Sequence, residues 1–320
     1  MLVNMMNPKT LQEAVVYFSN PENCLNYLVS RRFPNGVICP TCGRDDVSFL
    51  AKQQKWQCKS SHARRQFSIK TGTIFEDSAL GLDKWLIAMW LIGTAKNGIS
   101  SYELHRALGI TQKSAWFVLH RIRTAMTNGT IEKLSGTVEI DEAYIGGLPK
   151  NMHQSKRVRF VKPYTRQFPR NKTAVFGMVE RGGKVRAKVI KKGNTLRTDD
   201  VMPIIKANVE PESKVFTDQA IIYRDLWEKY VHASINHSRT YVRGEVHTNN
   251  IENFWSLLKR AIKGTYISVS PAHLQKYVEE QMFRYNEREG NDQMRFMRLI
   301  ELISGKRLTY AELIGYETGC

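Results

Sequence analysis

The sequence has few of the features that mark membrane-spanning, secreted or disordered proteins. Its longest apolar run, "WLIAMWLIG" at 85–93, is too short to cross a bilayer, and its first residues lack the charged-then-apolar order of a signal peptide. Only 5 cysteines are present, and such a set in a reducing compartment does not indicate a disulfide framework. Repeats and low-complexity tracts are absent. We therefore expect a globular, cytoplasmic protein.

Acidic residues are also scarce. The chain has 30 Asp and Glu against 48 Lys and Arg, which gives a net charge of +18 and a pI near 9.7. Such an excess is the electrostatic signature of a polyanionic partner. Nucleic acid is the leading candidate, and an anionic membrane surface is the second. With 320 residues, of which 42% are hydrophobic, the chain is long enough for several modules that each have a core.

Helical, strand-like and turn-rich stretches divide the chain into successive segments. Short helices broken near "SNPEN" are expected in 1–32, and strand-like pieces with clustered cysteines occupy 33–75. Residues 76–132 follow as a helical module. From 133 to 290 strands and helices alternate, which is typical of an α/β domain, and 291–320 form a helical tail.

The cysteines in "CPTCG" and "WQCKSSHARRQF" have the spacing of a metal site. Cys39 and Cys42 form a C-x-x-C pair, Cys58 follows after 15 intervening residues, and His62 stands beyond it after 3 more. A Cys3His set at these distances predicts a zinc ribbon with one structural Zn²⁺, which would stabilise a segment too small to hold itself together. The alternative is a lone structural C-x-x-C with an incidental histidine.

Residues 97–126 have the pattern of a helix-turn-helix. Two apolar helical periods are joined by a turn at "LGIT", and Thr111 or Ser114 is expected to cap the second helix. The second helix would enter a DNA groove, with Gln112, Lys113, Trp116, His120, Arg121 and Arg123 on or near its exposed side. The cations expected to bind DNA are Lys113, Arg121 and Arg123. Many helix pairs in enzymes have this shape without touching DNA, so simple packing stays open.

The stretch "GTVEIDEAYIGG", 136–147, begins as a β-branched strand but has a carboxylate, Asp141, at its centre. A buried charge is costly unless it is paired or binds a metal. Further along come a strand pair with a glycine turn, a helix, a strand with Asp218, a helix, another strand and a long helix. This is the order of an RNase H-like mixed sheet. In that fold the first and fourth strands are neighbours, so Asp141 and Asp218 would face a shared point.

Two carboxylates near one point repel each other unless divalent cations lie between them. The helix "HTNNIENFWSLLK" offers a third oxygen ligand, because Asn249 and Glu252 are three residues apart and share a face. Lys259 lies two turns beyond Glu252 on that face and could reach a DNA phosphate. Taken alone, Asp218 could instead cap the following turn, and Glu252 could be a solvated helix glutamate.

Together these motifs resemble bacterial insertion-sequence transposases of the DDE, RNase H-like class, in the subgroup with an N-terminal zinc ribbon. The resemblance rests on "GVICPTCG", "RRQFSIKTGTIFEDS", "VEIDEAYIGG", "VFTDQ", "HTNNIENFWSLLKR" and "YVEEQMFRYNER". It implies a DNA transposase whose acidic triad is Asp141, Asp218 and Glu252, with two Mg²⁺ or Mn²⁺ ions. Asn249 is the other candidate for the third ligand, and Lys259 is the basic residue that follows.

The implied reaction is a two-step phosphoryl transfer. Hydrolysis at each element end frees a 3′-hydroxyl, which then attacks target DNA. The implied partners are double-stranded DNA of the element ends and the target, together with further copies of the chain in a synaptic complex, and no membrane. The protein would be cytoplasmic and nucleoid-associated in a bacterium. An RNase H-like nuclease or resolvase, which stops after hydrolysis, and a catalytically inactive zinc-ribbon DNA-binding regulator are the alternatives.

The segment 148–172 has 8 Lys or Arg and no acid, and we expect a basic insertion that lies over DNA, or else a solvated loop. Its expected DNA contacts are Lys156, Arg157 and Arg159. Two further contacts, Lys259 and Arg260, are expected from the long helix. Glu142 would point to the opposite side of the strand from Asp141. Gly146 and Gly147 would end the strand and let the DNA backbone come close.

Overall fold

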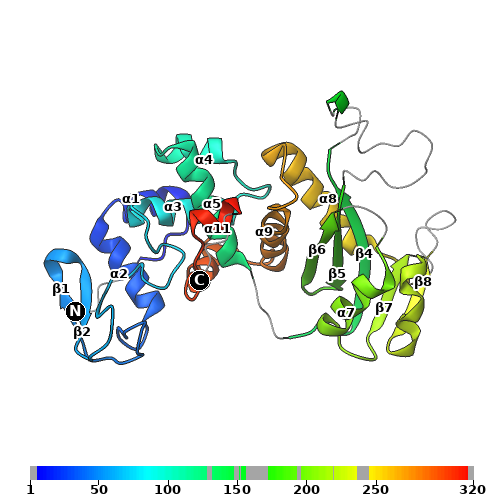
Figure 1. Ribbon diagram of the computed structural model, residues 1–320, viewed down its shortest axis with the longest axis horizontal. Coiled ribbons are helices and arrows are strands. Elements are labelled where there is room, and N and C mark those ends of the chain that lie inside the picture. The colour runs from blue at the N-terminus through cyan, green and yellow to red at the C-terminus, as the bar shows by residue number, and fades with distance from the viewer. Residues whose placement is uncertain are drawn as a thin grey trace. The chain divides into compact units, whose positions relative to one another are not determined.

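The computed structural model describes residues 6–127, 132–147, 151, 153–155, 172–192, 196–218, 220–235 and 245–315. The chain divides into two compact units, one of Met1–Thr127 with Arg288–Cys320 and one of Asn128–Glu287. Figure 1 labels most of the helices and strands of both. Each unit is described by itself below.

The first unit combines helices with a small sheet. Its helices are α1 (Leu11–Phe18), α2 (Pro21–Arg32), α3 (Leu82–Thr94), α4 (Ser101–Leu108), α5 (Gln112–Met126), α10 (Asp292–Glu301) and α11 (Tyr310–Ile314). Its strands are β1 (Val47–Leu50), β2 (Lys55–Cys58) and β3 (Gln66–Phe67), with the 3-10 turn η1 (Ala51–Gln53) after β1. The strands form an antiparallel sheet in the order β1-β2-β3.

Helix α3 supplies much of the core of this unit. Trp85 and Trp90 are only 1% and 2% exposed. The Trp90 ring lies 5.0 Å from the ring of Phe296 in α10, so the C-terminal tail packs on α3. The Ile74 amide donates to the Ile303 carbonyl at 3.1 Å, which ties that tail to the stretch that follows the ribbon.

The predicted helix-turn-helix pair is present as α4 and α5. Ser100 and Glu103 form a capping box at the start of α4, and Gly109 ends it with φ 63°. The Thr111 hydroxyl accepts a hydrogen bond from the Ser114 amide at 3.1 Å, so Thr111 is the cap of α5.

The second unit contains the mixed sheet that the sequence predicts. Its strands are β4 (Thr137–Ile145), β5 (Thr173–Glu180), β6 (Val185–Lys192), β7 (Lys214–Asp218) and β8 (Val231–Ile235), in the order β6-β5-β4-β7-β8. The first three strands form an antiparallel meander, in which Gly182 takes φ 72° in the turn before β6. β7 is parallel to β4, and β8 is parallel to β7.

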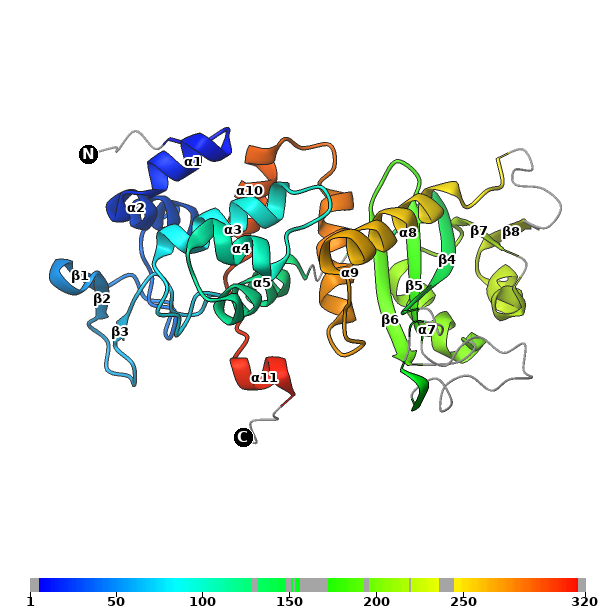
Figure 2. The ribbon, with the colours of Figure 1, turned by 90° about the horizontal axis from the view of Figure 1, so that it is seen from above.

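Helices cover both faces of this sheet. α7 (Thr198–Asn208) and the 3-10 helix η3 (Ile221–Glu228) share a core cluster with Val138 and Ile140 of β4. α8 (Asn249–Ala261) and α9 (Leu274–Asn286) share another with Ala143 and Ile145. Because alternate residues of a strand point to opposite faces, odd-numbered positions of β4 face α8. Figure 2 shows α8 lying across the strands.

Helix α9 also covers the outer edge of the sheet, as its amphipathic sequence indicates. Backbone amides of edge strand β6 donate to side chains of α9: Val185 to Asn286 Oδ1 at 2.7 Å, Ala187 to Met282 Sδ at 2.9 Å and Val189 to Gln275 Oε1 at 2.7 Å. An edge strand with unpaired amides invites association with another chain, and α9 occupies these donors.

Candidate active site and zinc ribbon

Asp141 lies in β4 on the face that α8 covers. Its Oδ2 accepts a hydrogen bond from the indole Nε1 of Trp255 in α8 at 3.0 Å. The residue opposite Asp141 on β5 is Gly177, and a Cβ there would lie 2.6 Å from Cη2 and Cζ2 of Trp255. The absence of a side chain at Gly177 is therefore what lets the indole lie over β5 and reach Asp141.

Asp218 ends β7, the strand next to β4. The parallel pairing of Glu139 with Phe216 brings Asp218, two residues further along, level with Asp141 on the neighbouring strand. Its Oδ1 accepts a hydrogen bond from the Ala220 amide at 3.0 Å. The prediction that the strands of Asp141 and Asp218 are neighbours is confirmed.

The electrostatics of this pair are unfavourable in the absence of a cation. Burial raises the pKa of Asp141 to about 7, and the negative charges of Glu142 and Asp218 add to the rise. Among the residues that the structure describes, no Lys or Arg forms an ion pair with Asp141 or Asp218. Hard oxygen donors with uncompensated charge are the chemistry that Mg²⁺ or Mn²⁺ prefers, so these residues fit a divalent ion.

Glu142 lies on the other face of the sheet, as the alternation of the strand predicts. Its Oε2 accepts a hydrogen bond from the Tyr223 hydroxyl at 2.7 Å, and Tyr223 belongs to the core cluster with α7 and η3. Burial raises the pKa of Glu142 as well, and this hydrogen bond partly offsets the rise. Glu142 thus influences Asp141 through its charge and not as a neighbour on the same face.

The remaining predicted catalytic residues lie on the exposed side of α8. Asn249, Glu252 and Lys259 are all exposed, and the Thr248 hydroxyl donates to Glu252 Oε1 at 3.0 Å. Within the described residues, the only group of three or more His, Cys, Asp or Glu whose ligand atoms lie within 4.8 Å of one another is the cysteine cluster. Ligation by Glu252 or Asn249 together with Asp141 therefore requires an exposed side chain to turn toward the strands.

A second carboxylate on this face of β4, Glu139, has no role in the sequence-based prediction. It is 0% exposed and lies two residues before Asp141. Its Oε2 accepts hydrogen bonds from the amides of Asn250 and Ile251 at 2.8 and 3.2 Å. These amides belong to the first turn of α8. The N–H groups of a first turn have no acceptor within their own helix, and the positive end of the helix dipole favours a negative charge there.

Arg181 completes this arrangement. Its Nε pairs with Glu139 Oε1 at 2.7 Å, and its terminal nitrogen donates to the His247 carbonyl at 3.1 Å. Glu139 thus joins β4 to the start of the helix that carries Asn249 and Glu252. The signal in the sequence was the spacing in "VEIDE", because residues two apart in a strand share a face.

The zinc ribbon brings all the predicted ligands together. Cys39 Sγ lies 3.5 Å from His62 Nε2, Cys42 Sγ lies 3.7 Å from Cys58 Sγ, and the ligand atoms all lie within 4.8 Å of one another. His62 Nδ1 lies 2.6 Å from the Ala63 carbonyl oxygen, which can accept a hydrogen bond from Nδ1–H and so leaves Nε2 for a metal. Three thiols and one imidazole fit a closed tetrahedral Zn²⁺ site.

The predicted DNA contacts of α5 are partly wrong. Arg121 and Arg123 are 3% and 1% exposed, and His120 is 0% exposed. The Arg121 guanidinium donates to the Glu76 carbonyl and lies 5.5 Å from the Trp85 ring. Arg121 is buried because a backbone carbonyl and an aromatic face replace water around its guanidinium, which helical periodicity does not reveal.

The other predicted contacts have different surroundings. Lys113 is exposed, with its Nζ 4.7 Å from the Tyr310 ring, and Lys259 and Arg260 are exposed on α8. Lys156, Arg157 and Arg159 lie outside the described residues. None of the helices in the described ranges is long and apolar enough to cross a membrane.

Comparisons with known proteins identify transposase domains in this chain. Residues 133–286 match the model of the ISXO2-like transposase domain, and residues 19–64 match the transposase zinc-ribbon domain. A protein in transposable element ISH50 of Halobacterium salinarum is 29% identical over 256 residues, which cover 76% of this chain and 83% of that protein. A transposase-like protein of Haemophilus influenzae is 30% identical over 106 residues, covering 33% of this chain and 84% of that protein. A crystal structure of the Mos1 strand transfer complex aligns at 12% identity over 61% of this chain and 74% of that one, with a TM-score of 0.24.

Proposed function

Because this chain belongs to the insertion-sequence transposases of the DDE class with an N-terminal zinc ribbon, we propose that it cleaves DNA at the ends of its element and joins those ends to target DNA. The observation that supports the chemistry is the pair Asp141 and Asp218 on neighbouring strands. Burial and like charge raise the pKa of Asp141 to about 7. Asp141 and Asp218 would hold a divalent cation, whose positive charge would offset their repulsion and favour the ionised form of Asp141.

Asp141 and Asp218 are assigned as metal ligands from their positions on neighbouring strands, and Glu252 from its charge. Asp141, Asp218 and Glu252 would together hold two Mg²⁺ or Mn²⁺ ions. The ions would supply activation of the attacking oxygen and stabilisation of the leaving oxygen. Glu252 is preferred to Asn249 because an anion binds Mg²⁺ better than an amide. Lys259 would contact a phosphate of the DNA.

The remaining parts of the chain would bind and hold the DNA. The net charge of +18 favours a double-stranded DNA partner, and this binding would weaken with salt. Cys39, Cys42, Cys58 and His62 would hold one structural Zn²⁺. Joining two element ends to a target requires several copies of the chain in one complex, so we propose a homo-oligomeric synapse.

A strand-transfer assay tests this function. The substrate is a labelled duplex with the sequence that flanks the coding region, incubated with plasmid target and Mg²⁺. We expect Asp141→Asn and Asp218→Asn to lose cleavage and joining, and Glu142→Gln, on the other face of β4, to retain most activity. Glu252→Gln should be inactive and Asn249→Ala active, and the reverse result would make Asn249 the third ligand.

Other results would overturn the proposal. Full activity of Asp141→Asn would show that the chemistry lies elsewhere. Nicked but unjoined products from the wild type would favour a nuclease. Tight binding of the same duplex without any cleavage in Mg²⁺ or Mn²⁺ would favour a DNA-binding regulator.

A further inference from the structure

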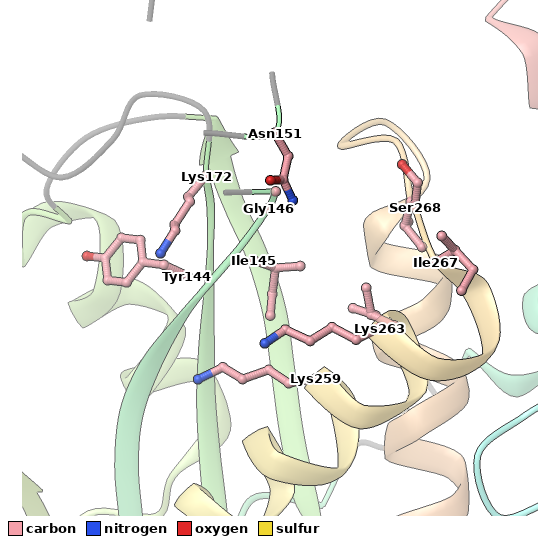
Figure 3. Close-up of a pocket in the computed structure, with 12 residues that line it drawn as sticks. Tyr144, Ile145, Gly146, Asn151, Lys172, Lys259, Lys263, Ile267 and Ser268 are labelled. Carbon is pink, nitrogen blue, oxygen red and sulfur yellow. The ribbon is translucent and has the colours of Figure 1, made fainter. Parts of the chain in front are cut away.

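A pocket opens where β4 ends, between that strand and the end of α8. Its volume is about 570 Å³, and its lining includes Lys172, Lys259 and Lys263 together with the apolar Ile145 and Ile262. Figure 3 shows the three ammonium groups pointing into the same space beside Ile145. Lys259 and Lys263 are one helical turn apart, and Lys172 comes from the residue before β5.

The charge of this pocket is one-sided. Within the described ranges, none of these three lysines forms an ion pair with a carboxylate. Ammonium groups gathered in one pocket repel one another, and an anion removes that repulsion. Lysine binds phosphate as a point charge, so the pocket has the chemistry of a phosphate site.

The rim of the pocket is a strained turn. α8 continues as a π-helix, η4 (Ile262–Tyr266), a rare form that is frequent at functional sites. The next residue, Ile267, has φ 62° and ψ −55°, and the Ser268 amide donates to the Tyr266 carbonyl at 2.6 Å across it. This is a γ-turn of the strained, positive-φ kind, with a β-branched residue at its centre.

The turn is held in place by its neighbours in the second unit. The Tyr266 hydroxyl donates to Glu280 of α9, and the Tyr266 ring lies 4.7 Å from the Tyr277 ring. Glu280 is 0% exposed and also pairs with Arg284. Ile267 itself is 75% exposed at the pocket rim. Such strain persists only where surrounding contacts impose it, and it is typical of binding sites.

We propose that this pocket binds backbone phosphates of a DNA strand that runs along β4 from the metal site, and that Ile267 packs against a sugar or base of that strand. This assignment of the pocket rests on the proposed function. Ile145 lies four residues beyond Asp141 on β4, about 13 Å at the rise of a strand, which places the pocket a few nucleotides from the metal site. Exposed isoleucines are among the apolar side chains that proteins insert at base steps.

Binding of the flanking-sequence duplex, measured by fluorescence anisotropy between 50 and 200 mM salt, tests this site. All variants carry Asp141→Asn, so that cleavage does not interfere. Removing one phosphate contact lowers the slope of log affinity against log salt concentration by about 0.9. The parent should therefore bind more tightly than Lys263→Ala at 50 mM salt, and the ratio of their affinities should shrink about 3.5-fold by 200 mM. Ile267→Ala should bind about fivefold more weakly at every salt concentration, because it loses an uncharged contact.

Matched variants separate these effects from general damage. Lys206→Ala on α7 removes an exposed lysine from the other face of the sheet, and Val231→Ala trims an exposed apolar residue on β8; both should bind like the parent. Ile267→Gly suits the positive φ and should melt no lower than the parent, yet should bind as weakly as Ile267→Ala.

The inference is overturned if Lys263→Ala and Ile267→Ala bind like Lys206→Ala and Val231→Ala. It is also overturned if Ile267→Gly restores parental affinity, since the effect of Ile267→Ala would then be one of backbone conformation. If the wild type does not cleave DNA, but Lys263→Ala and Ile267→Ala weaken binding as expected, the proposed reaction is contradicted. The assignment of the pocket as a DNA-binding site then stands.

Discussion

Replacing Asp141 by Asn should stabilise the protein in the absence of divalent ions, and only above a certain pH. The folded protein raises the pKa of this carboxyl from 3.8 to about 7. Between these values the folded state holds a proton that the unfolded state releases, so the free energy of unfolding falls as pH rises from about 4 to about 7. Asn accepts the same hydrogen bond from Trp255 but has no charge, so the free energy of unfolding of the variant does not fall in this way as pH rises.

The magnitude follows from the pKa difference. Each pKa unit corresponds to about 1.4 kcal/mol, so the rise from 3.8 to about 7 amounts to roughly 4 kcal/mol at pH 9 as an upper limit. In a unit of this size each kcal/mol shifts the midpoint of thermal unfolding by about 2–4 °C. The second unit of Asp141→Asn should therefore melt up to roughly 8–16 °C above the wild type at pH 9. The two proteins should melt together near pH 4.

Scanning calorimetry from pH 4 to pH 9, without added divalent ions, measures this difference. A chelator is omitted because it would also remove metal from the ribbon. Asp225→Asn, which replaces an exposed aspartate in η3, is the control and should follow the wild type at every pH. Added Mg²⁺ should raise the midpoint of the wild type at pH 8 and leave Asp141→Asn unchanged. Identical pH profiles for Asp141→Asn and wild type would refute the reasoning, because they would mean that the carboxylate is compensated in the folded protein.

Other predictions concern residues around the same sheet and the ribbon. Gly177→Ala puts a Cβ 2.6 Å from the Trp255 ring, so it should cost about 1–3 kcal/mol in urea unfolding and shift tryptophan fluorescence; Gly264→Ala, with open space around its Cβ, should do neither. Glu139→Gln leaves Arg181 without its buried charged partner and should lower the free energy of unfolding by about 3 kcal/mol, whereas a change below about 0.5 kcal/mol would contradict the role given to this carboxylate. Cys42→Ser should abolish stoichiometric zinc measured by atomic absorption, and Cys24→Ser, outside the ligand set, should retain it; zinc retained by Cys42→Ser would remove that residue from the site.

Features that depend on residues close in the chain could be predicted. The spacing of Cys39, Cys42, Cys58 and His62 was sufficient for the ribbon, because its ligands belong to short turns and a hairpin. The order of strands and helices followed from hydrophobic periodicity and glycine turns, and with it the prediction that Asp141 and Asp218 lie on neighbouring strands. The placement of Glu142 on the opposite face followed from strand alternation alone.

The roles of other residues could not be predicted from local pattern. Arg121 looks like a solvent-facing residue in the sequence, yet Trp85 and a carbonyl of the preceding segment surround it. In the sequence, Glu139 is a charged residue in a strand with no visible partner. In the structure, its carboxylate accepts a hydrogen bond from the Asn250 amide in the first turn of α8. The strained turn at Ile267 follows Tyr266, whose hydroxyl donates a hydrogen bond to Glu280 of α9, a contact between segments that the local sequence does not reveal.

The sequence by itself therefore determined the order of the strands of the mixed sheet, the grouping of Cys39, Cys42 and Cys58 with His62, and the strands that carry the paired aspartates, because short-range spacing and periodicity encode these features. Only the tertiary structure decided which charges are buried, that Gly177 makes room for Trp255 over Asp141, and that three lysines share a pocket with a strained isoleucine at its rim. The physical reason is that burial and electrostatic environment are set by contacts between elements distant in the chain, and a single sequence does not display those contacts.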